Sequence, residues 1–290
     1  MRTVRAASEL ERRPRAVAIG TFDGVHLGHR RALEHALAAA PALTPTVVTF
    51  DPHPRTALGN KVDLLTTLER RLELIAELGF EETLVIEFDL EVARLSPDAF
   101  AENVLRPIGT KIVVAGEDFR FGHARSGDLA LLERLRFDVR RVPLLAGVSS
   151  SEIRGLLAGG EIARAARLLG RPPEVEGVVV AGDARGGTLG FPTANLGVPP
   201  DVLVPRYGIY AGAAEGKRAA VSIGTNPHYG GQERRVEAYL LDYAGDLYGH
   251  RLIVQLWQRL RDEQAFASEA DLVAQIGRDV DAVRRAEPPV

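Results

Sequence analysis

The fold of the first half of this chain is decided by the stretch Val17-Ala18-Ile19-Gly20-Thr21-Phe22-Asp23-Gly24-Val25-His26-Leu27-Gly28-His29. Residues 17–19 form an apolar run typical of a strand, and Gly20 ends it. One buried helix face is predicted next, because apolar residues recur at helical spacing, namely Leu33, Ala36, Leu37 and Ala40. A helix that begins after such a turn presents unpaired N–H groups and the positive end of its dipole. This helix start therefore favours an anion, phosphate above all.

Glycines and histidines in the same stretch support that interpretation. Gly20, Gly24 and Gly28 lack a Cβ where a ligand would approach the backbone. His26 and His29 are three residues apart, so on a helical turn they point the same way. A histidine pair can also hold a metal, but zinc needs three or four ligands and the chain has no cysteine. A strand–glycine–helix turn is common in α/β proteins, so the residues alone favour phosphate binding without requiring it.

The composition bounds the class of protein. A length of 290 residues predicts about two domains, and the net charge of −3 argues against a dedicated nucleic-acid binder. Scattered arginine pairs such as Arg70-Arg71 are expected on solvated faces. The lack of cysteine excludes disulfides, thiolate metal sites and a cysteine nucleophile. No apolar run has transmembrane length and residues 1–15 are too polar for a signal peptide, so a soluble cytoplasmic protein is expected.

Strands and helices alternate through the first half. Apolar strands are predicted at 46–50, 83–88, 111–115 and about 139–145, with helices at 29–40, from a capping box at 66–69 to residue 79, and from 96 to about 106. This alternation predicts a parallel sheet with right-handed crossovers. The strand ends would bring residues 20–29, 51–54 and 116–122 to one rim, where open α/β sheets bind ligands. His53, in a proline-braced loop, is either a site residue or part of a simple turn.

Two further segments of the first half have polar or aromatic residues that could contact a ligand. Gly116-Glu117-Asp118-Phe119-Arg120-Phe121-Gly122 has two aromatic residues that either plug the end of the sheet or contact a planar ligand. Ser149-Ser150-Ser151-Glu152-Ile153-Arg154 opens a helix, where a serine is normally an N-cap. Capping does not account for three hydroxyls with an arginine one turn further on.

The pattern changes after the stiff segment Arg171-Pro172-Pro173, which we expect to separate domains at 1–170 and 174–290. Short apolar runs between turn residues follow at 175–181, 208–214, 219–223, 236–243 and 251–257. They predict a small antiparallel barrel or sandwich, followed by a helix that opens at Ser268.

One loop and one strand of the second half contain residues that could bind a ligand or take part in a reaction. The loop is Gly182-Asp183-Ala184-Arg185-Gly186-Gly187-Thr188-Leu189-Gly190-Phe191-Pro192-Thr193-Ala194-Asn195, whose glycines expose N–H groups that can cradle phosphates. Thr193 and Asn195 face the same side of an extended segment and offer oxygen ligands that Mg²⁺ accepts beside nucleotide phosphates. Glu237 is a lone carboxylate in an apolar strand, either a functional group or an edge-strand gatekeeper.

These strings resemble those of the bacterial bifunctional riboflavin kinase/FAD synthetases. Residues 20–29 are similar to the G-x-F-D-G-x-H-x-G-H signature of the nucleotidyltransferase superfamily, and residues 116–122 to the family's G-x-D-F-x-F-G loop. Residues 149–154 resemble its S-S-T-x-I-R signature, with Ser151 in place of threonine. Residues 182–195 are close to the riboflavin kinase signature G-x-x-x-x-G-R-x-L-G-F-P-T-A-N. Gly187 stands where the family usually has arginine or lysine, and Arg185 could substitute for it.

The resemblance implies an α/β plus β protein: a Rossmann-like nucleotidyltransferase domain with a parallel sheet, then a small antiparallel β-barrel with a terminal helix. It implies phosphorylation of riboflavin to FMN by ATP and Mg²⁺, and adenylylation of FMN to FAD with release of pyrophosphate. Small molecules would be the partners, with neither nucleic acid nor membrane.

The resemblance also assigns roles to residues. Glu237 would be the base of the kinase, Thr193 and Asn195 the metal ligands, and His26, His29 and Arg154 the groups that stabilise charge in adenylyl transfer. Flavin contacts are implied for Asp118, Phe119 and Phe121. Nucleotide and phosphate contacts are implied for Gly20, Phe22, Asp23, Gly24, Gly28, Ser150, Ser151, Gly182, Arg185, Gly190, Pro192 and Asn195.

Two other functions are compatible with parts of this pattern. One is a riboflavin kinase with a degenerate first domain, against which the intact His26, His29 and Arg154 count. The other is a flavin storage or sensor protein, against which Glu237 and the Thr193/Asn195 pair count, because storage needs neither a base nor a magnesium site.

Overall fold

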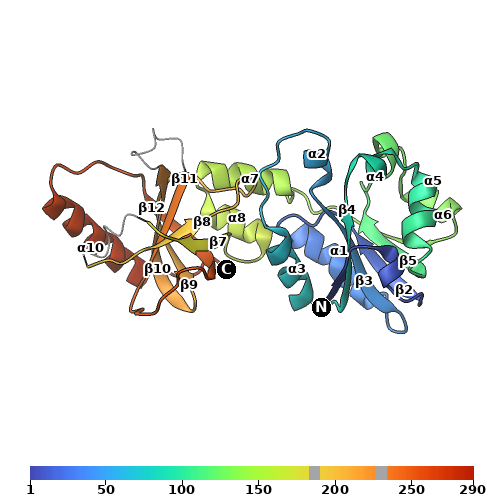
Figure 1. Ribbon diagram of the computed structural model, residues 1–290, viewed down its shortest axis with the longest axis horizontal. Coiled ribbons are helices and arrows are strands. Elements are labelled where there is room, and N and C mark those ends of the chain that lie inside the picture. The colour runs from blue at the N-terminus through green and yellow to red at the C-terminus, as the bar shows by residue number, and fades with distance from the viewer. Residues whose placement is uncertain (183–189, 226–233) are drawn as a thin grey trace. The chain divides into compact units, whose positions relative to one another are not determined.

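The computed structural model describes residues 1–182, 190–225 and 234–290, and the chain divides into two compact units, Met1–Ser150 and Ser151–Val290 (Figure 1). The domain boundary expected at residues 170–174 stays a prediction. Among the described residues, no helix is both long and apolar enough to cross a membrane. The cytoplasmic location also stays a prediction.

The first unit is built on a six-stranded sheet in the order β1-β4-β3-β2-β5-β6. Its strands are β1 (Arg2–Val4), β2 (Arg15–Ile19), β3 (Thr44–Asp51), β4 (Glu82–Glu87), β5 (Thr110–Gly116) and β6 (Asp138–Val142). Every pair of neighbouring strands is parallel. The predicted parallel α/β architecture is therefore confirmed.

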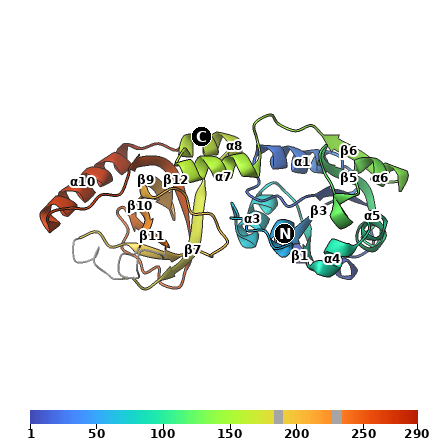
Figure 2. The same ribbon diagram turned by 90° about the horizontal axis from the view of Figure 1, so that it is seen from above.

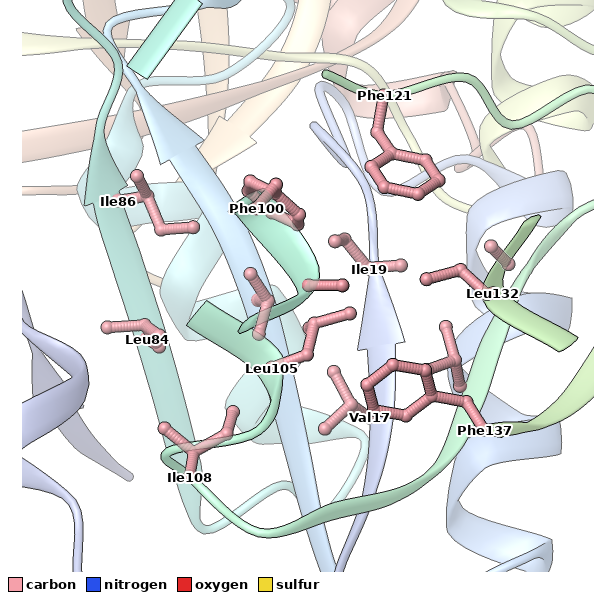
Figure 3. Close-up of a cluster of buried hydrophobic side chains, with 14 of the residues drawn as sticks. Val17, Ile19, Leu84, Ile86, Phe100, Leu105, Ile108, Phe121, Leu132 and Phe137 are labelled. Carbon is pink, nitrogen blue, oxygen red and sulfur yellow. The ribbon is translucent and has the colours of Figure 1, made fainter. Parts of the chain in front are cut away.

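Helices cover both faces of this sheet. Side chains alternate along each strand, so each apolar strand presents buried residues to both faces. Val17 and Ile19 of β2 belong to one buried cluster, and Figure 3 shows their side chains turned toward Phe100, Leu105 and other residues of the helices that cover that face. These helices are α5 (Pro97–Phe100), the π-helical turn η2 (Ala101–Leu105) and α6 (Leu129–Arg134). Ala18 points the other way, into a second cluster with residues of α1 (Leu27–Ala38) and α3 (Leu68–Glu77). Short helices α2 (Pro54–Ala57) and α4 (Leu90–Arg94) follow β3 and β4.

The strand order creates a switch point beside β2. Within the sheet, β3 and β4 lie on one side of strand β2, whereas β5 and β6 lie on its other side. Open α/β sheets bind ligands at the carboxyl ends of the two strands that flank such a point. Those ends, of β2 and β5, lead into residues 20–29 and 116–122, two of the three segments predicted to share a rim.

The second unit is a closed barrel of six strands in the order β10-β11-β8-β7-β12-β9, with antiparallel neighbours throughout. The strands are β7 (Glu174–Val180), β8 (Ala194–Gly197), β9 (Gly208–Ala214), β10 (Lys217–Thr225), β11 (Arg234–Leu240) and β12 (Arg251–Arg261). Helix α10 (Glu269–Arg285) lies along β9 and β10 (Figure 2), and Ser268 caps it as expected. The predicted barrel with a terminal helix is confirmed.

Two helices precede the barrel, α7 (Ser150–Gly159) and α8 (Ile162–Leu169). They belong to the second compact unit from Ser151 onward. The Arg206 N–H donates to the Leu157 carbonyl at 3.0 Å, which ties the end of α7 to the segment before β9. Gly170 ends α8 in the left-handed conformation.

The predicted cap of α3 is wrong by one residue. Thr67, rather than Thr66, accepts the capping hydrogen bond, from the Arg70 N–H. Thr66 is buried and accepts instead from the Gly24 N–H at 3.2 Å. The Thr66 hydroxyl, which local sequence assigned to the cap of α3, is therefore used in a long-range hydrogen bond to the turn after β2.

Candidate functional site

The turn after β2 has an unusual backbone. Phe22, Gly24 and Val25 all have positive φ, at 51°, 83° and 39°. Positive φ is rare for a bulky residue and a clear outlier for a β-branched one. A Cβ at Gly24 would lie 2.7 Å from the Leu65 side chain, so a side chain there is excluded by space as well as by φ. Phe22 and Val25 are almost fully buried, which shows that packing maintains the strained turn.

Asp23 fixes this turn to the segment before α3. Its Oδ1 accepts hydrogen bonds from the backbone N–H groups of Leu65, at 2.9 Å, and Thr66, at 3.3 Å. Its residue surface is 1% exposed. The carboxylate therefore has a structural task, and its contact with a nucleotide stays a prediction.

The two histidines lie against each other at the start of α1. The His26 and His29 rings stack with centroids 3.6 Å apart and planes 16° apart. His26 is the N-cap, and its Nδ1 accepts from the His29 N–H at 3.2 Å. Because Nδ1 accepts, a neutral His26 ring has its proton on Nε2. A Cβ at Gly28 would lie 3.1 Å from the His26 ring, so glycine gives this ring its space.

The serine segment reaches the same turn through one hydrogen bond. Ser150 Oγ donates to the Asp23 carbonyl at 3.0 Å. Ser151 and Arg154 lie further along α7 and belong to the second compact unit. Within the first unit the structure therefore brings together the glycine turn, both histidines and Ser150. Phosphate contacts of Ser151 and Arg154 stay predictions.

Arg71 is a residue of this region that the sequence analysis misjudged. The expectation of a solvated face is wrong for Arg71, which is 4% exposed. Its guanidinium donates to the Thr21 carbonyl at 2.7 Å and to the Phe50 carbonyl at 3.1 Å. Burial lowers the pKa of Arg71, whereas the charges of Asp23 and Asp51 act to raise it. The only sequence signal is its helical spacing to Leu74 and Ile75, the other buried residues of α3.

The loop after β5 divides its two aromatic residues between packing and exposure. Phe121 is 7% exposed and belongs to the cluster of Figure 3, where its ring lies 5.7 Å from that of Phe100. Phe121 thus packs into the core at the end of the sheet. Phe119 stacks on Phe121 and is partly buried, and Asp118 is exposed. Flavin contacts of this loop stay predictions.

His53 caps a short helix that follows β3. Its Nδ1 accepts from the Arg55 N–H at 3.2 Å, at the start of α2. The proline-braced loop is thus a helix entry at the carboxyl end of a central strand.

In the second unit, Glu237 points to the outer face of the barrel. Buried and half-buried residues alternate along β11, so Val236 and Ala238 face the interior and Glu237 does not. Glu237 Oε1 accepts from Thr193 Oγ1 at 3.4 Å and from Arg235 Nη2 at 2.5 Å. Pairing with arginine and threonine makes a half-buried carboxylate tolerable in this strand.

A pocket of about 290 Å³ opens at this carboxylate. Its polar part contains Thr193, Arg235 and Glu237, together with Glu263. Its apolar part is formed by side chains of the loop before β8, of β11, of the segment after β12 and of α10, namely Phe191, Tyr239, Phe266, Leu272 and Ile276. An apolar pocket with a carboxylate in its lining can hold the flat ring of a ligand. A hydroxyl group on the ligand can then lie beside the carboxylate, which can act as a base.

Asn195 lies next to the same carboxylate in the sheet. Residue 195 pairs with Glu237 across β8 and β11, which puts both side chains on one face. A Cβ at Gly182 would overlap the Asn195 amide, so glycine there makes room for it. Gly190, with φ of 85°, and Pro192 lie on the approach to β8 and are exposed. Arg185 and Gly187 lie outside the described residues.

Four charged residues of this pocket were not predicted from the sequence, namely Arg235, Arg261, Glu263 and Asp279. Arg235 is two residues before Glu237 on the same strand, so the period of two could have shown that they share a face. Glu263 follows β12, and burial raises its pKa against the opposing charges of Arg261 and Arg235. No local pattern indicates that the Glu263 carboxylate lies against Gly224 of β10.

The same chain matches two family models. The model described as FAD synthetase matches residues 8–152, and the model described as riboflavin kinase matches residues 169–286. Both lie in the order expected from the sequence strings. Residues 153–168, which include Arg154, fall between the two matches.

Curated relatives and one solved structure span nearly the whole chain. The chain is 37% identical over 282 residues to the bifunctional riboflavin kinase/FMN adenylyltransferase of Listeria monocytogenes, covering 91% of this chain and 90% of the relative. It is 36% identical to the protein of the same name from Escherichia coli K12, covering 96% of each. A crystal structure described as a macrolide-efflux protein from Streptococcus pneumoniae is similar with a TM-score of 0.87 and 30% identity, covering 98% of both chains. This chain belongs to the family of bifunctional riboflavin kinase/FMN adenylyltransferases.

Proposed function

We propose that this chain converts riboflavin to FMN with one ATP and FMN to FAD with a second ATP, releasing pyrophosphate in the second step. The observation that carries the proposal is the match of both family models in one chain, with relatives of the same two-part name over nine-tenths of its length. The first unit would be the adenylyltransferase and the barrel the kinase.

In the kinase step the 5′-hydroxyl of the ribityl chain attacks the γ-phosphorus of ATP. The new O–P bond forms as the bond to the β–γ bridging oxygen breaks, and ADP leaves. Glu237 accepts the hydroxyl proton. Arg235 and Thr193 both bind Oε1, which fixes the carboxylate for that role.

Thr193 and Asn195 are the residues that would hold Mg²⁺ in the kinase site. They fit because both offer neutral oxygen donors of the kind this cation accepts, and because both lie beside Glu237, Thr193 by a hydrogen bond and Asn195 by strand pairing. When bound, the cation neutralises charge on the phosphates of ATP.

In the adenylyl step an oxygen of the FMN phosphate attacks the α-phosphorus of ATP. The P–O bond to the pyrophosphate breaks, so the protein needs no nucleophile of its own. Its work is positioning and charge stabilisation, which we assign to His26, His29 and Arg154. The N-terminus of α1, which follows the glycine turn, supports this assignment, because a helix N-terminus favours phosphate.

The test is chromatography of riboflavin, ATP and Mg²⁺ after incubation with the purified protein. We expect FMN to appear first and FAD after it. A second incubation that starts from FMN and ATP measures adenylylation alone, and the double variant Glu237→Gln/His29→Ala is the matched control. Products that stop at FMN would contradict the assignment of the first unit, and unchanged riboflavin would contradict the kinase.

A further inference from the structure

A buried guanidinium joins two segments of the first unit that lead to the adenylyltransferase site. Arg71 of α3 donates from Nη1 to the Thr21 carbonyl at 2.7 Å and from Nη2 to the Phe50 carbonyl at 3.1 Å. Thr21 follows the end of β2, and Phe50 is near the end of β3. One side chain thus links two adjacent strands at their carboxyl ends, where β2 leads into residues 20–26 and β3 leads into residues 51–54.

The shape of arginine suits this link. A guanidinium holds its N–H donors in a rigid fork, so one group can satisfy two carbonyls on neighbouring strands at fixed separation. The Thr21 carbonyl also accepts from Thr49 Oγ1 at 3.2 Å, so this peptide unit is held from two directions. Lysine keeps the charge but has a single nitrogen on a flexible chain, and it cannot reproduce the fork.

Packing alone does not explain an arginine at this position. A buried charge is costly unless it is paired, and an apolar side chain would fill α3's buried face at lower cost. Asp23 and Asp51 lie near enough to favour the charged form of Arg71, and both belong to the site segments. Arg71 Nε has no hydrogen-bond partner among the described residues, and the Nη1 and Nη2 hydrogen bonds of Arg71 both go to carbonyls at the strand ends.

The turn beside Arg71 needs external support. Phe22 and Val25 have positive φ, and such a backbone persists only when the surroundings determine it. Asp23 holds the turn through Leu65 and Thr66, and Arg71 holds it through Thr21. The turn leads directly to His26, the cap of α1.

We propose that Arg71 is a positioning residue for adenylyl transfer, which holds the histidine turn against the end of β3 without touching substrate. This inference rests on the proposed function of the first unit. A misplaced turn would lower the turnover of FMN to FAD, because a small displacement of site groups can cost about 10- to 100-fold in rate. Binding of flavin would change much less, so kcat should fall while the KM for FMN stays near its wild-type value.

The experiment compares two buried arginines of the same sheet. Arg71→Met removes the link at the carboxyl end, and Arg15→Met removes an equally buried arginine of β2 that is bonded to Glu82 at the other end of the sheet. Arg71→Lys keeps the charge without the fork. For each full-length variant we measure the unfolding temperature, kcat and KM for FMN to FAD well below that temperature, and the kinase rate as an internal standard.

The inference is supported if Arg71→Met lowers kcat for FAD formation about 10-fold or more and Arg71→Lys lowers it less, while Arg15→Met stays within about 3-fold of wild type at the same folded fraction. It is overturned if Arg71→Met keeps its kcat, or if Arg15→Met loses as much. If Arg71→Met does not fold, an Arg71→Lys variant with unchanged kcat overturns the inference and one with lowered kcat supports it. A wild-type protein that makes no FAD would overturn the proposed function itself, which is visible before any variant is compared.

Discussion

The position of Glu237 in the barrel decides between the two roles that the sequence left open for this carboxylate. A carboxylate in an apolar strand indicates either function or protection of an edge, and β11 is not an edge, because it pairs with β10 and β8 in a closed barrel. The gatekeeper alternative is therefore excluded by the topology. What remains is a carboxylate paired on one oxygen and facing a pocket.

Glu237→Gln should abolish FMN formation while FMN-to-FAD conversion survives. Glutamine keeps the size of the side chain but cannot accept the proton, and loss of a general base costs about 10²- to 10⁴-fold. Both rates are measured by chromatography on the same preparation, so retained FAD formation shows that the first unit is folded, and the unfolding temperature checks the barrel.

The control for that prediction is Glu215→Gln, in the exposed turn between β9 and β10, which should leave both rates unchanged. Glu263→Gln tests the competing carboxylate of the pocket. If Glu263→Gln loses FMN formation and Glu237→Gln keeps it, we have assigned the base to the wrong residue.

His26→Asn separates helix capping from chemistry. Asparagine is a good N-cap, so α1 should keep its stability, whereas the imidazole is lost. We expect FAD formation to fall about 100-fold, the usual effect of removing a group that stabilises transition-state charge. The unfolding temperature should stay near that of His35→Asn, a matched change in the last turn of the same helix. Unchanged FAD formation in His26→Asn would show that this histidine is only a cap.

Single residues were predictable where short-range spacing decides their direction. The shared face of Thr193 and Asn195 and the paired direction of His26 and His29 follow from strand and helix periods. Arg71 and Phe121 were not predictable in the same way. Their burial depends on what covers the face, and that is decided by segments far away in sequence.

At the scale of elements, long apolar runs were predictable and short polar strands were not. Strand β8 is four residues long and consists of Ala-Asn-Leu-Gly, so neither composition nor alternation marks it. Its pairing with β7 and β11 creates it, and those partners are distant in sequence. The buried face of α3 was also misjudged, because Arg71 was expected on a solvated face and is instead buried there with Leu74 and Ile75.

The amino end of the sheet depends on an ion-paired glutamate of β4. Glu82 is 4% exposed and is bonded to Arg13 and Arg15. Burial alone would raise the pKa of Glu82, but the hydrogen bonds and charges of the two arginines lower it below its ordinary value. Such a group stabilises the fold above its unfolded-state pKa, about 4.3, and loses that contribution as the pH falls toward the folded-state value.

Acid should therefore destabilise the wild-type protein more than Glu82→Gln, although Glu82→Gln is less stable at neutral pH. We measure thermal unfolding at about pH 6 and about pH 3.5, a window that spans the unfolded-state pKa. The exposed Glu34→Gln of α1 should lose as much stability as the wild type. Equal losses in wild type and Glu82→Gln would show that the Arg13–Glu82–Arg15 cluster is not linked to acid stability.

At the scale of the whole molecule, the change of hydrophobic period near residue 173 predicted two architectures in one chain. Helix-and-strand alternation before it and short runs with turns after it were enough for the fold class of each part. The order of strands in the barrel could not be predicted, because closure depends on pairings such as β9 with β12 that connect distant segments. Local sequence does not encode such register directly.

Two sites in two compact units should act through free FMN. Glu237→Gln retains only adenylylation and His29→Ala retains only the kinase, so neither variant alone should make FAD from riboflavin. Mixed together with riboflavin, ATP and Mg²⁺, they should make FAD after a lag in which FMN accumulates, because changes at separate sites act independently. The lag should shorten as the concentration of Glu237→Gln is raised. FMN that accumulates without any FAD, although the same Glu237→Gln preparation converts added FMN, would show that the two sites must lie in one chain to pass the intermediate between them.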